Sequence, residues 1–150
     1  MVSLLSEASL QLRRQVLEKE FSRINDRQRE AVFTVNGPLL VLAGAGSGKT
    51  TVLVNRIANL IRYGSAYQDT ASQLSEQDIA DMQEYLHHDT PLSEITRSHL
   101  AVSPVVSGHI LAITFTNKAA GELKQRLANM LGEAGSQVWA STFHSSCARI

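Results

Sequence analysis

The stretch LLVLAGAGSGKTT, residues 39–51, restricts the possible folds of this chain more than any other feature. An apolar run breaks into small residues and glycines, and a lysine followed by two threonines comes next. Short apolar runs bounded by glycines are typical of buried strands, and a glycine-rich turn leaves backbone N–H groups free for an anion. The stretch therefore predicts a strand over residues 39–43, a phosphate-holding loop, and a helix that begins near Gly48.

The loop and the start of the predicted helix carry groups suited to a nucleotide. Backbone amides around Gly46 and Gly48 would point at the phosphates. Lys49 would reach the β and γ oxygens, and the Thr50 hydroxyl would bind magnesium. Lys49 and Thr50 are the predicted catalytic residues, and Thr50 is the predicted metal ligand. The predicted nucleotide-binding residues of this stretch are Ala43, Gly44, Ala45, Gly46, Ser47, Gly48, Lys49, Thr50 and Thr51.

Strands and helices are expected to alternate along most of the chain. Apolar residues at helical spacing between Leu4 and Val16 indicate an amphipathic first helix. Asn25 has the character of an N-cap, with Gln28 at the third helical position. Further helices are expected over residues 48–63 and 119–131 and after Thr142, with strands over 109–115 and 138–141. Strand-helix repetition with apolar strands predicts an α/β fold, a parallel sheet with flanking helices.

The charged residues are unevenly distributed, although 14 basic and 14 acidic residues cancel. Residues 64–104 contain one Lys or Arg against seven Asp or Glu, and both flanking regions are mildly basic. Net charge therefore does not exclude a nucleic-acid partner. The acidic segment 65–107 is longer than a crossover needs. We expect a helical insertion there, with one helix capped by Ser75 and one opened by Thr90 and Pro91. We interpret it as a solvated surface elaboration that lies away from DNA, and a partner-docking site is the alternative.

Other classes of protein fit the chain poorly. The first residues have neither the pattern of a signal peptide nor that of a spanning helix, so we expect no membrane partner and a cytoplasmic location. The single Cys147 has no cysteine at metal-ligand spacing and is expected to be a small buried hydrophobe.

Two further features point to the nucleotide base and to nucleic acid. The Gln28 amide could read the N6 and N7 edge of adenine, or could serve only in a capping box. The stretch after the second predicted strand offers a ring, a hydroxyl, an amide and a cation in Phe115, Thr116, Asn117 and Lys118, which suits single-stranded nucleic acid. A core ring and a solvated lysine are the alternatives.

Four stretches in order resemble the motifs of UvrD/Rep/PcrA-type superfamily 1 DNA helicases. INDRQREAV is similar to the Q motif, AGAGSGKT to motif I, AITFTNKAAGEL to motif Ia, and VWASTFHSSCARI to the TFH motif. The resemblance implies a RecA-like P-loop NTPase fold, ATP and Mg²⁺ as cofactors, and adenine recognition by Gln28. It implies 3′ to 5′ translocation in DNA repair or replication, on single-stranded DNA and 3′-tailed duplex DNA. The implied DNA-binding residues are Phe115, Thr116, Asn117, Lys118, Thr142 and His144.

Two residues depart from the pattern of that family. Many members carry an arginine directly after the P-loop threonine, where it can lie against adenine, and this chain has Thr51 there. Gly121 falls inside a predicted helix, at a cost of about 1 kcal/mol relative to alanine.

ATP hydrolysis needs groups that are not evident in these residues. No apolar strand ends in Asp or Glu, so the expected magnesium carboxylate is missing, as are the γ-phosphate sensors and a second motor domain. We therefore expect residues 1–150 to be the N-terminal part of a first RecA-like ATPase domain, with 65–107 inserted in it. It would act with the remainder of the helicase chain and be inactive alone. The alternatives are a small P-loop kinase and a stand-alone nucleotide- or DNA-binding module.

Overall fold

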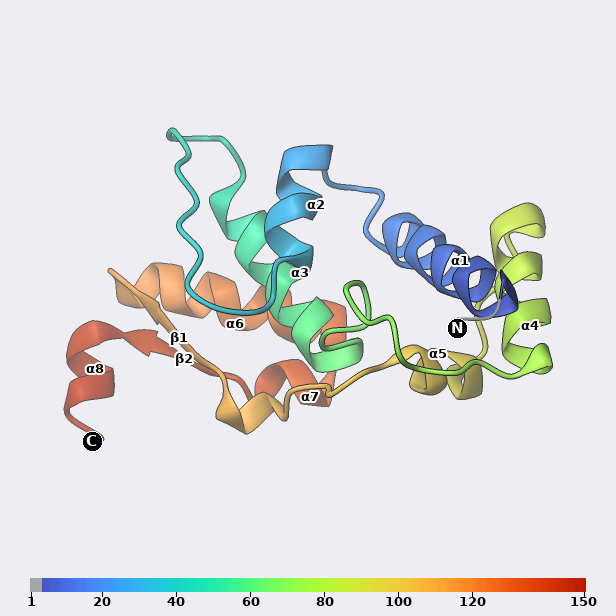
Figure 1. Ribbon diagram of the computed structural model, residues 1–150. Coiled ribbons are helices and arrows are strands. Elements are labelled where there is room, and N and C mark those ends of the chain that lie inside the picture. Colours follow the sequence, from blue (N-terminus) through green and yellow to red (C-terminus); the bar gives the residue numbers. More distant parts are fainter. Residues whose placement is uncertain (1–3) are drawn as a thin grey trace.

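The computed structural model describes residues 4–150, an elongated arrangement of helices with a small sheet at one end (Figure 1). The side chains of Leu4 and Leu5 lie outside the described part. Among residues 4–150, none of the helices combines the length and apolar character that a membrane crossing requires. The elements are α1 (Leu4–Glu20), α2 (Asp26–Phe33), α3 (Lys49–Arg62), α4 (Glu76–His88), α5 (Glu94–Leu100), the 3-10 helix η1 (Ser107–His109), β1 (Leu111–Thr114), α6 (Asn117–Leu131), α7 (Glu133–Ser136), β2 (Trp139–Thr142) and α8 (Phe143–Cys147).

The sheet consists of β1 and β2, which run parallel and in register from Leu111 opposite Trp139 to Thr114 opposite Thr142. Helices α6 and α7 connect the two strands, and α6 packs on them together with α3. Their shared core is formed by Val54, Ile57, Ala112, Leu123, Leu127, Val138 and Ala140. The expected mixture of helices with parallel strands is confirmed. Strand β1 is shorter than its predicted range of 109–115, and β2 is shifted by one residue from its predicted range of 138–141.

The predicted strand over residues 39–43 is wrong. These residues form an extended segment between α2 and α3 that has no strand assignment (Figure 1). A strand exists only when its backbone is hydrogen-bonded to a neighbour, and within residues 4–150 the two strands pair only with each other. Leu40 and Leu42 are consequently 80% and 86% exposed.

Most predicted helix ends are confirmed. Asn25 caps α2 in a capping box with Gln28, and α3 runs between Gly48 as N-cap and Tyr63 as C-cap. Thr142 caps α8, as predicted. The predicted start of α5 at Thr90 is wrong. The helix is capped by Ser93, whose hydroxyl accepts the backbone N–H of Thr96. A capping hydroxyl stabilises only the helix whose third amide it reaches.

The segment 65–107 is less solvated than predicted. It carries α4 and α5, and it contributes Ala66, Met82, Leu92 and Leu100 to a core shared with α1, α2 and the end of α3. The interpretation of this segment as a solvated surface elaboration is therefore wrong for its buried residues. The apolar side of α1 is buried by packing against residues of α4 and α5. These helices lie at the end of the molecule opposite to the carboxyl ends of β1 and β2 (Figure 1).

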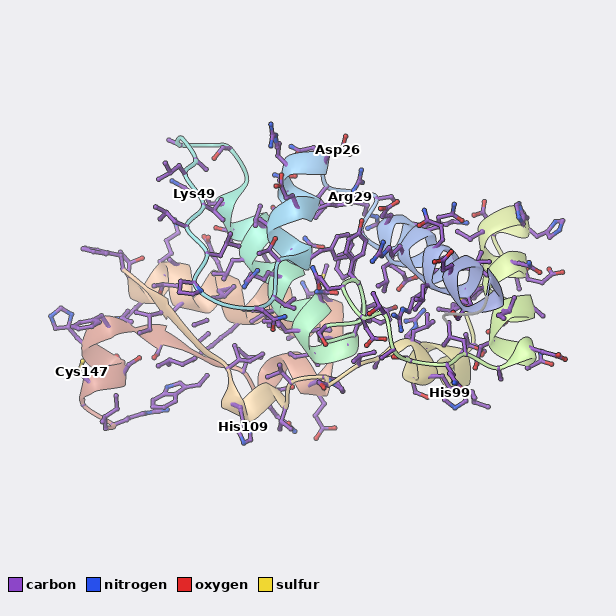
Figure 2. All side chains as sticks on the ribbon, viewed as in Figure 1. Asp26, Arg29, Lys49, His99, His109 and Cys147 are labelled. Atoms are coloured by element: carbon purple, nitrogen blue, oxygen red, sulfur yellow. The ribbon has the colours of Figure 1, made fainter. Side chains whose placement is uncertain are left out.

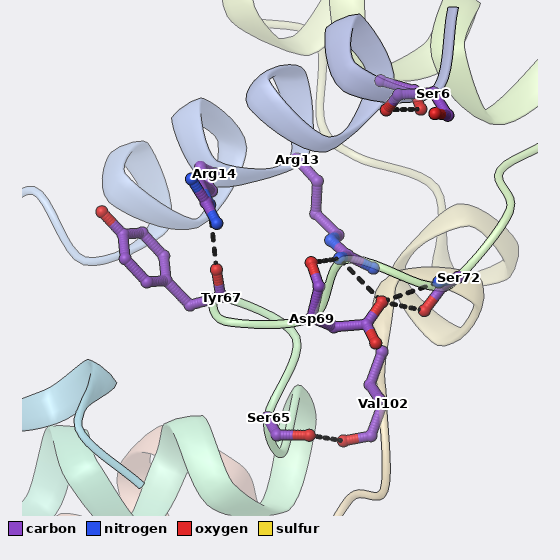
Figure 3. A network of polar contacts seen from close by, with 9 residues as sticks. Ser6, Arg13, Arg14, Ser65, Tyr67, Asp69, Ser72 and Val102 are labelled. Atoms are coloured by element: carbon purple, nitrogen blue, oxygen red, sulfur yellow. Dashed lines mark hydrogen bonds and ion pairs between the residues drawn. The ribbon is translucent and has the colours of Figure 1, made fainter. Parts of the chain in front are cut away.

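A partly buried polar network joins α1 to the loop before α4 (Figure 3). The fully buried Arg13 donates through Nη2 to the Asp69 carbonyl at 2.7 Å and to Asp69 Oδ2 at 3.0 Å. Asp69 also accepts from the Ser72 backbone N–H at 2.9 Å and from the Ser72 hydroxyl. Burial by itself raises the pKa of Asp69, but the bonds from Ser72 and Arg13 outweigh it and lower that pKa to about 2.

A second polar cluster joins α1 to the end of α3. Glu20 accepts from the hydroxyls of Tyr63 and Tyr85, each at 2.7 Å. Burial, followed by the proximity of Glu20, raises the pKa of Tyr63. The end of the phosphate-loop helix is thus tied to α1 and α4.

Cys147 is exposed, so the prediction that it is buried is wrong (Figure 2). Helix α8 has five residues and turns only one side toward the rest of the fold. Ser146 occupies that side, with a hydrogen bond to the Ser141 hydroxyl.

Candidate functional site

The predicted phosphate loop ends at an open helix terminus. Gly46 and Gly48 have φ values of +74° and +82°, in the left-handed region that favours glycine. Gly48 is the N-cap of α3 without a side-chain hydrogen bond, and the first helical bond runs from the Val52 N–H to the Gly48 carbonyl at 3.0 Å. The amides of residues 49–51 therefore have no partner within the helix. Together with the helix dipole they form an anion site.

Lys49 and Thr50 stand exposed at this terminus. Lys49 Nζ donates to the Ala43 carbonyl at 3.3 Å, so the side chain folds back along the loop (Figure 2). The Thr50 hydroxyl has no hydrogen-bond partner within residues 4–150 and is free to act as a ligand. A cavity of about 180 Å³ lies beside the loop and holds no Asp or Glu in its lining, which is formed by Asn25, Arg27, Gln28, Ala31, Val41, Leu42, Ala43, Ser47, Lys49 and Val52. The residues fit a phosphate group and offer magnesium one hydroxyl.

Gln28 lies between α2 and the loop, with both ends of its amide engaged. Its Oε1 accepts from the Asn25 backbone N–H at 3.0 Å, and its Nε2 donates to the Ser47 carbonyl at 3.4 Å. The capping box that the sequence allows is therefore formed. Adenine recognition would require the long bond to Ser47 to open, and remains a prediction.

Gly48 provides a test of the loop conformation. A Cβ at this position would lie 2.9 Å from Gln28 Nε2, and the left-handed backbone costs a non-glycine residue about 1–2 kcal/mol. We therefore expect Gly48→Ala to lower the free energy of unfolding by that amount and to weaken ATP binding, measured by urea denaturation and equilibrium dialysis. Gly121→Ala is the matched control, because a Cβ there meets nothing within 4 Å and the helix gains about 1 kcal/mol. Equal effects of the two variants would contradict the assigned role of the loop.

Phe115 and its neighbours lie at the carboxyl end of β1. The Phe115 side chain is 99% exposed, so the alternative of a core ring is excluded for the described residues. Thr116 caps α6 by accepting the Ala119 N–H at 3.1 Å, and Asn117 and Lys118 are exposed on its first turn. These residues present a ring, an amide and a cation to solvent.

Thr142 and His144 lie at the carboxyl end of β2 and differ in accessibility. Thr142 is buried, and its hydroxyl accepts the Ser145 N–H at 3.2 Å and donates to the Ser145 hydroxyl at 3.0 Å. This hydroxyl is thus occupied as a helix cap. His144 is exposed and close to the carboxyl end of β1, because Thr142 pairs with Thr114. The sheet therefore brings the two groups of predicted DNA-binding residues to one edge.

Sequence reasoning missed two residues beside these sites. Phe143 directly follows β2, as Phe115 follows β1, and is 61% exposed. The repeated order of strand, threonine and phenylalanine was the signal for it. Arg126 of α6 donates to the Thr51 hydroxyl at 3.4 Å. No local pattern could reveal that contact, since 75 residues separate the two.

Comparison with known proteins agrees with the motifs. The family model described as "UvrD/REP helicase N-terminal domain" matches residues 24–150, so α1 precedes the matched range. A protein named ATP-dependent DNA helicase PcrA from Staphylococcus epidermidis is 43% identical over 127 residues, which cover 85% of this chain and 12% of that protein. The protein of the same name from Staphylococcus aureus is 41% identical over 129 residues, covering 86% of this chain and 12% of its own. The predicted resemblance is confirmed, and the chain belongs to the UvrD/REP helicase N-terminal domain family.

Proposed function

We propose that this chain is the N-terminal, ATP-binding portion of an ATP-dependent 3′ to 5′ DNA helicase, which unwinds DNA in repair or replication in the cytoplasm. The open amino end of α3, with Lys49 beside it, is the observation that carries the proposal. That terminus suits a triphosphate, and the relatives are named for ATP and DNA. Residues 1–150 would form part of the first RecA-like domain, with residues 65–107 as an insertion in it.

The nucleotide would bind through the loop amides, Lys49 and Thr50, with Gln28 at the base. The amides and Lys49 hold the β and γ phosphates, and Thr50 gives magnesium one ligand. Magnesium supplies charge neutralisation to the phosphates when bound. The carboxylate that completes its site and the water-positioning groups would come from the remainder of the helicase chain. A strand from that remainder would also pair with residues 39–43 and cover Leu40 and Leu42.

Single-stranded DNA would bind across the carboxyl ends of β1 and β2. Phe115 offers a stacking ring, and Asn117, Lys118 and His144 offer polar and cationic groups to the backbone. The acidic helix α4 lies at the other end of the molecule, where its carboxylates do not repel the strand (Figure 1). A strand with a duplex beyond it, as in 3′-tailed DNA, is the substrate that an unwinding enzyme requires.

Phe115→Ala tests the DNA part of this proposal. We expect the substitution, made in the full-length helicase, to weaken single-stranded DNA binding by about 1–3 kcal/mol, because one stacked base loses its platform. The melting temperature should stay the same, since the ring is almost fully exposed. Fluorescence anisotropy with a labelled oligonucleotide measures the affinity, and Phe115→Tyr, which keeps a ring, is the control. An alanine variant that binds normally, or one that unfolds while its folded fraction binds normally, would show that Phe115 is not a platform.

A further inference from the structure

We infer that Tyr67 and Gln68 are positioning residues for nucleotide binding: they hold the carboxyl end of α2 and thereby keep Gln28 in place for the base. This inference rests on the proposed function, since it requires Gln28 to contact adenine, and it gives the segment 65–107 a role in that function. It depends on the contacts at the carboxyl end of α2 and on the anchoring of the turn after α3.

Helix α2 has eight residues, Asp26–Phe33, and needs contacts at both ends. Isolated helices shorter than about 12–15 residues are marginal in water. At the amino end, the capping box of Asn25 and Gln28 provides the contacts. Gln28 lies less than two turns before Phe33, so a shift of the carboxyl end of α2 also moves the Gln28 amide.

Two carbonyls in the last turn of α2 are held by α3. Arg56 Nη1 donates to the Ala31 carbonyl at 2.6 Å, and Asn59 Nδ2 donates to the Val32 carbonyl at 3.2 Å. The last four carbonyls of a helix have no partner within the helix, so these side chains replace missing bonds. They tie one side of α2 to the phosphate-loop helix and leave the Phe33 carbonyl to another partner.

That partner is the turn after α3. Gln68 Nε2 donates to the Phe33 carbonyl. The Tyr67 ring stacks on the buried Phe33 ring, with the centroids 4.1 Å apart and the planes inclined by 1°. The last residue of α2 is therefore fixed by two contacts that do not involve Arg56 or Asn59.

The turn is itself anchored on α1 (Figure 3). Arg14 Nε donates to the Tyr67 carbonyl at 3.0 Å, and the Tyr67 hydroxyl donates to Glu18 at 2.7 Å. The next anchor is the ion pair between Asp69 and the buried Arg13 at 3.0 Å. Helix α1 in turn shares a core with α4 and α5. The carboxyl end of α2 thus lies between α3 and a turn that is fixed to a larger body.

The position of the Gln28 amide decides which base it can read. Adenine presents an acceptor at N7 and a donor at N6, whereas guanine presents acceptors at both N7 and O6. Gln28 Nε2 would donate to N7. Its Oε1 accepts the Asn25 N–H with one lone pair and would accept from N6 with the other. Guanine offers Oε1 no donor at this edge, so a displaced α2 weakens the discrimination between ATP and GTP.

The test compares hydrolysis of ATP and GTP by the full-length helicase in the presence of single-stranded DNA. We expect Gln68→Ala and Tyr67→Ala each to lower the ratio of kcat/KM for ATP to that for GTP by about 2- to 10-fold, the range that one hydrogen bond contributes. The loss should appear in KM and not in kcat, because a base contact binds the ground state and the transition state equally. In a Gln28→Ala background, neither substitution should lower the ratio further.

Two further variants separate positioning from folding. Tyr67→Phe should keep the wild-type ratio because it keeps the stacked ring. Gln77→Ala is the matched control, since it removes an exposed glutamine of α4 from the same segment and should change nothing. A wild-type ratio in either folded alanine variant of the turn overturns the inference, and so does a wild-type ratio in Gln28→Ala or a further loss in that background. A wild-type enzyme that hydrolyses neither nucleotide would instead refute the proposed function.

Discussion

ATP hydrolysis by purified residues 1–150 should be indistinguishable from background, and Lys49→Ala should reduce hydrolysis by the full-length helicase by about 10²–10³-fold or more. The structure gives the isolated chain an open α3 terminus, Lys49 and the Thr50 hydroxyl, but no carboxylate in the cavity beside them. Stabilisation of the transferring phosphoryl group by arginine is alone worth about 10³–10⁵ in rate, and it would come from the remainder of the helicase. Steady-state phosphate release with and without single-stranded DNA measures both effects.

Lys49→Ala also distinguishes the N-terminal portion of a helicase from a complete small enzyme. Lys49 is exposed and bonded only to the Ala43 carbonyl in the described residues, so its removal should leave the melting temperature unchanged. Lys49→Arg keeps the charge and serves as the second control. Turnover by residues 1–150 that disappears in Lys49→Ala would favour a complete small enzyme, such as a P-loop kinase, over the N-terminal portion of a helicase.

Asp69→Ala should lower the free energy of unfolding by about 3–5 kcal/mol, the usual cost of leaving a buried charge without its partner. Arg13 is fully buried, and its Nε and Nη1 already lack hydrogen-bond partners within residues 4–150. Its Nη2 donates to the Asp69 carboxylate and to the Asp69 carbonyl, and the substitution removes the carboxylate, the charged partner of the two (Figure 3). Urea denaturation followed by circular dichroism measures the loss.

The exposed pair Arg27 and Glu30 is the matched control, because surface ion pairs contribute only about 0–1 kcal/mol. Glu30→Ala should therefore change the stability little. The pH dependence gives a second readout. The folded pKa of Asp69, about 2, lies below the usual value for an unfolded chain, so its contribution is complete above about pH 4 and is lost as the pH falls toward 2. The wild type should lose more stability over that range than Asp69→Ala, and an equal loss would contradict the stabilising role of the ion pair between Arg13 and Asp69.

Local signals in the sequence determined the caps, the glycines and the phosphate loop. The Asn25 capping box, the Gly48 start of α3 and the Thr142 cap were predictable because each depends on atoms within about four residues. The motif order was equally readable, and it identified the family. The prediction that Phe115 is a platform came from its place after a strand and from the family resemblance, and the structure adds that its ring is exposed.

The tertiary structure decided what depends on partners far away in the chain. Residues 39–43 have the composition of a buried strand, yet a strand also needs a neighbour's backbone, and β1 and β2 pair only with each other in the described residues. The segment 65–107 is acidic, yet several of its residues are buried because they pack on the apolar side of α1, and Asp69 pairs with the buried Arg13. Thr142 comes to lie beside Thr114 through the register of two strands that are distant in the chain. A short stretch of sequence determines its local hydrogen bonds and its hydrophobic periodicity. The burial of a side chain and the pairing of a strand depend on residues far away in the chain, so no short stretch determines them.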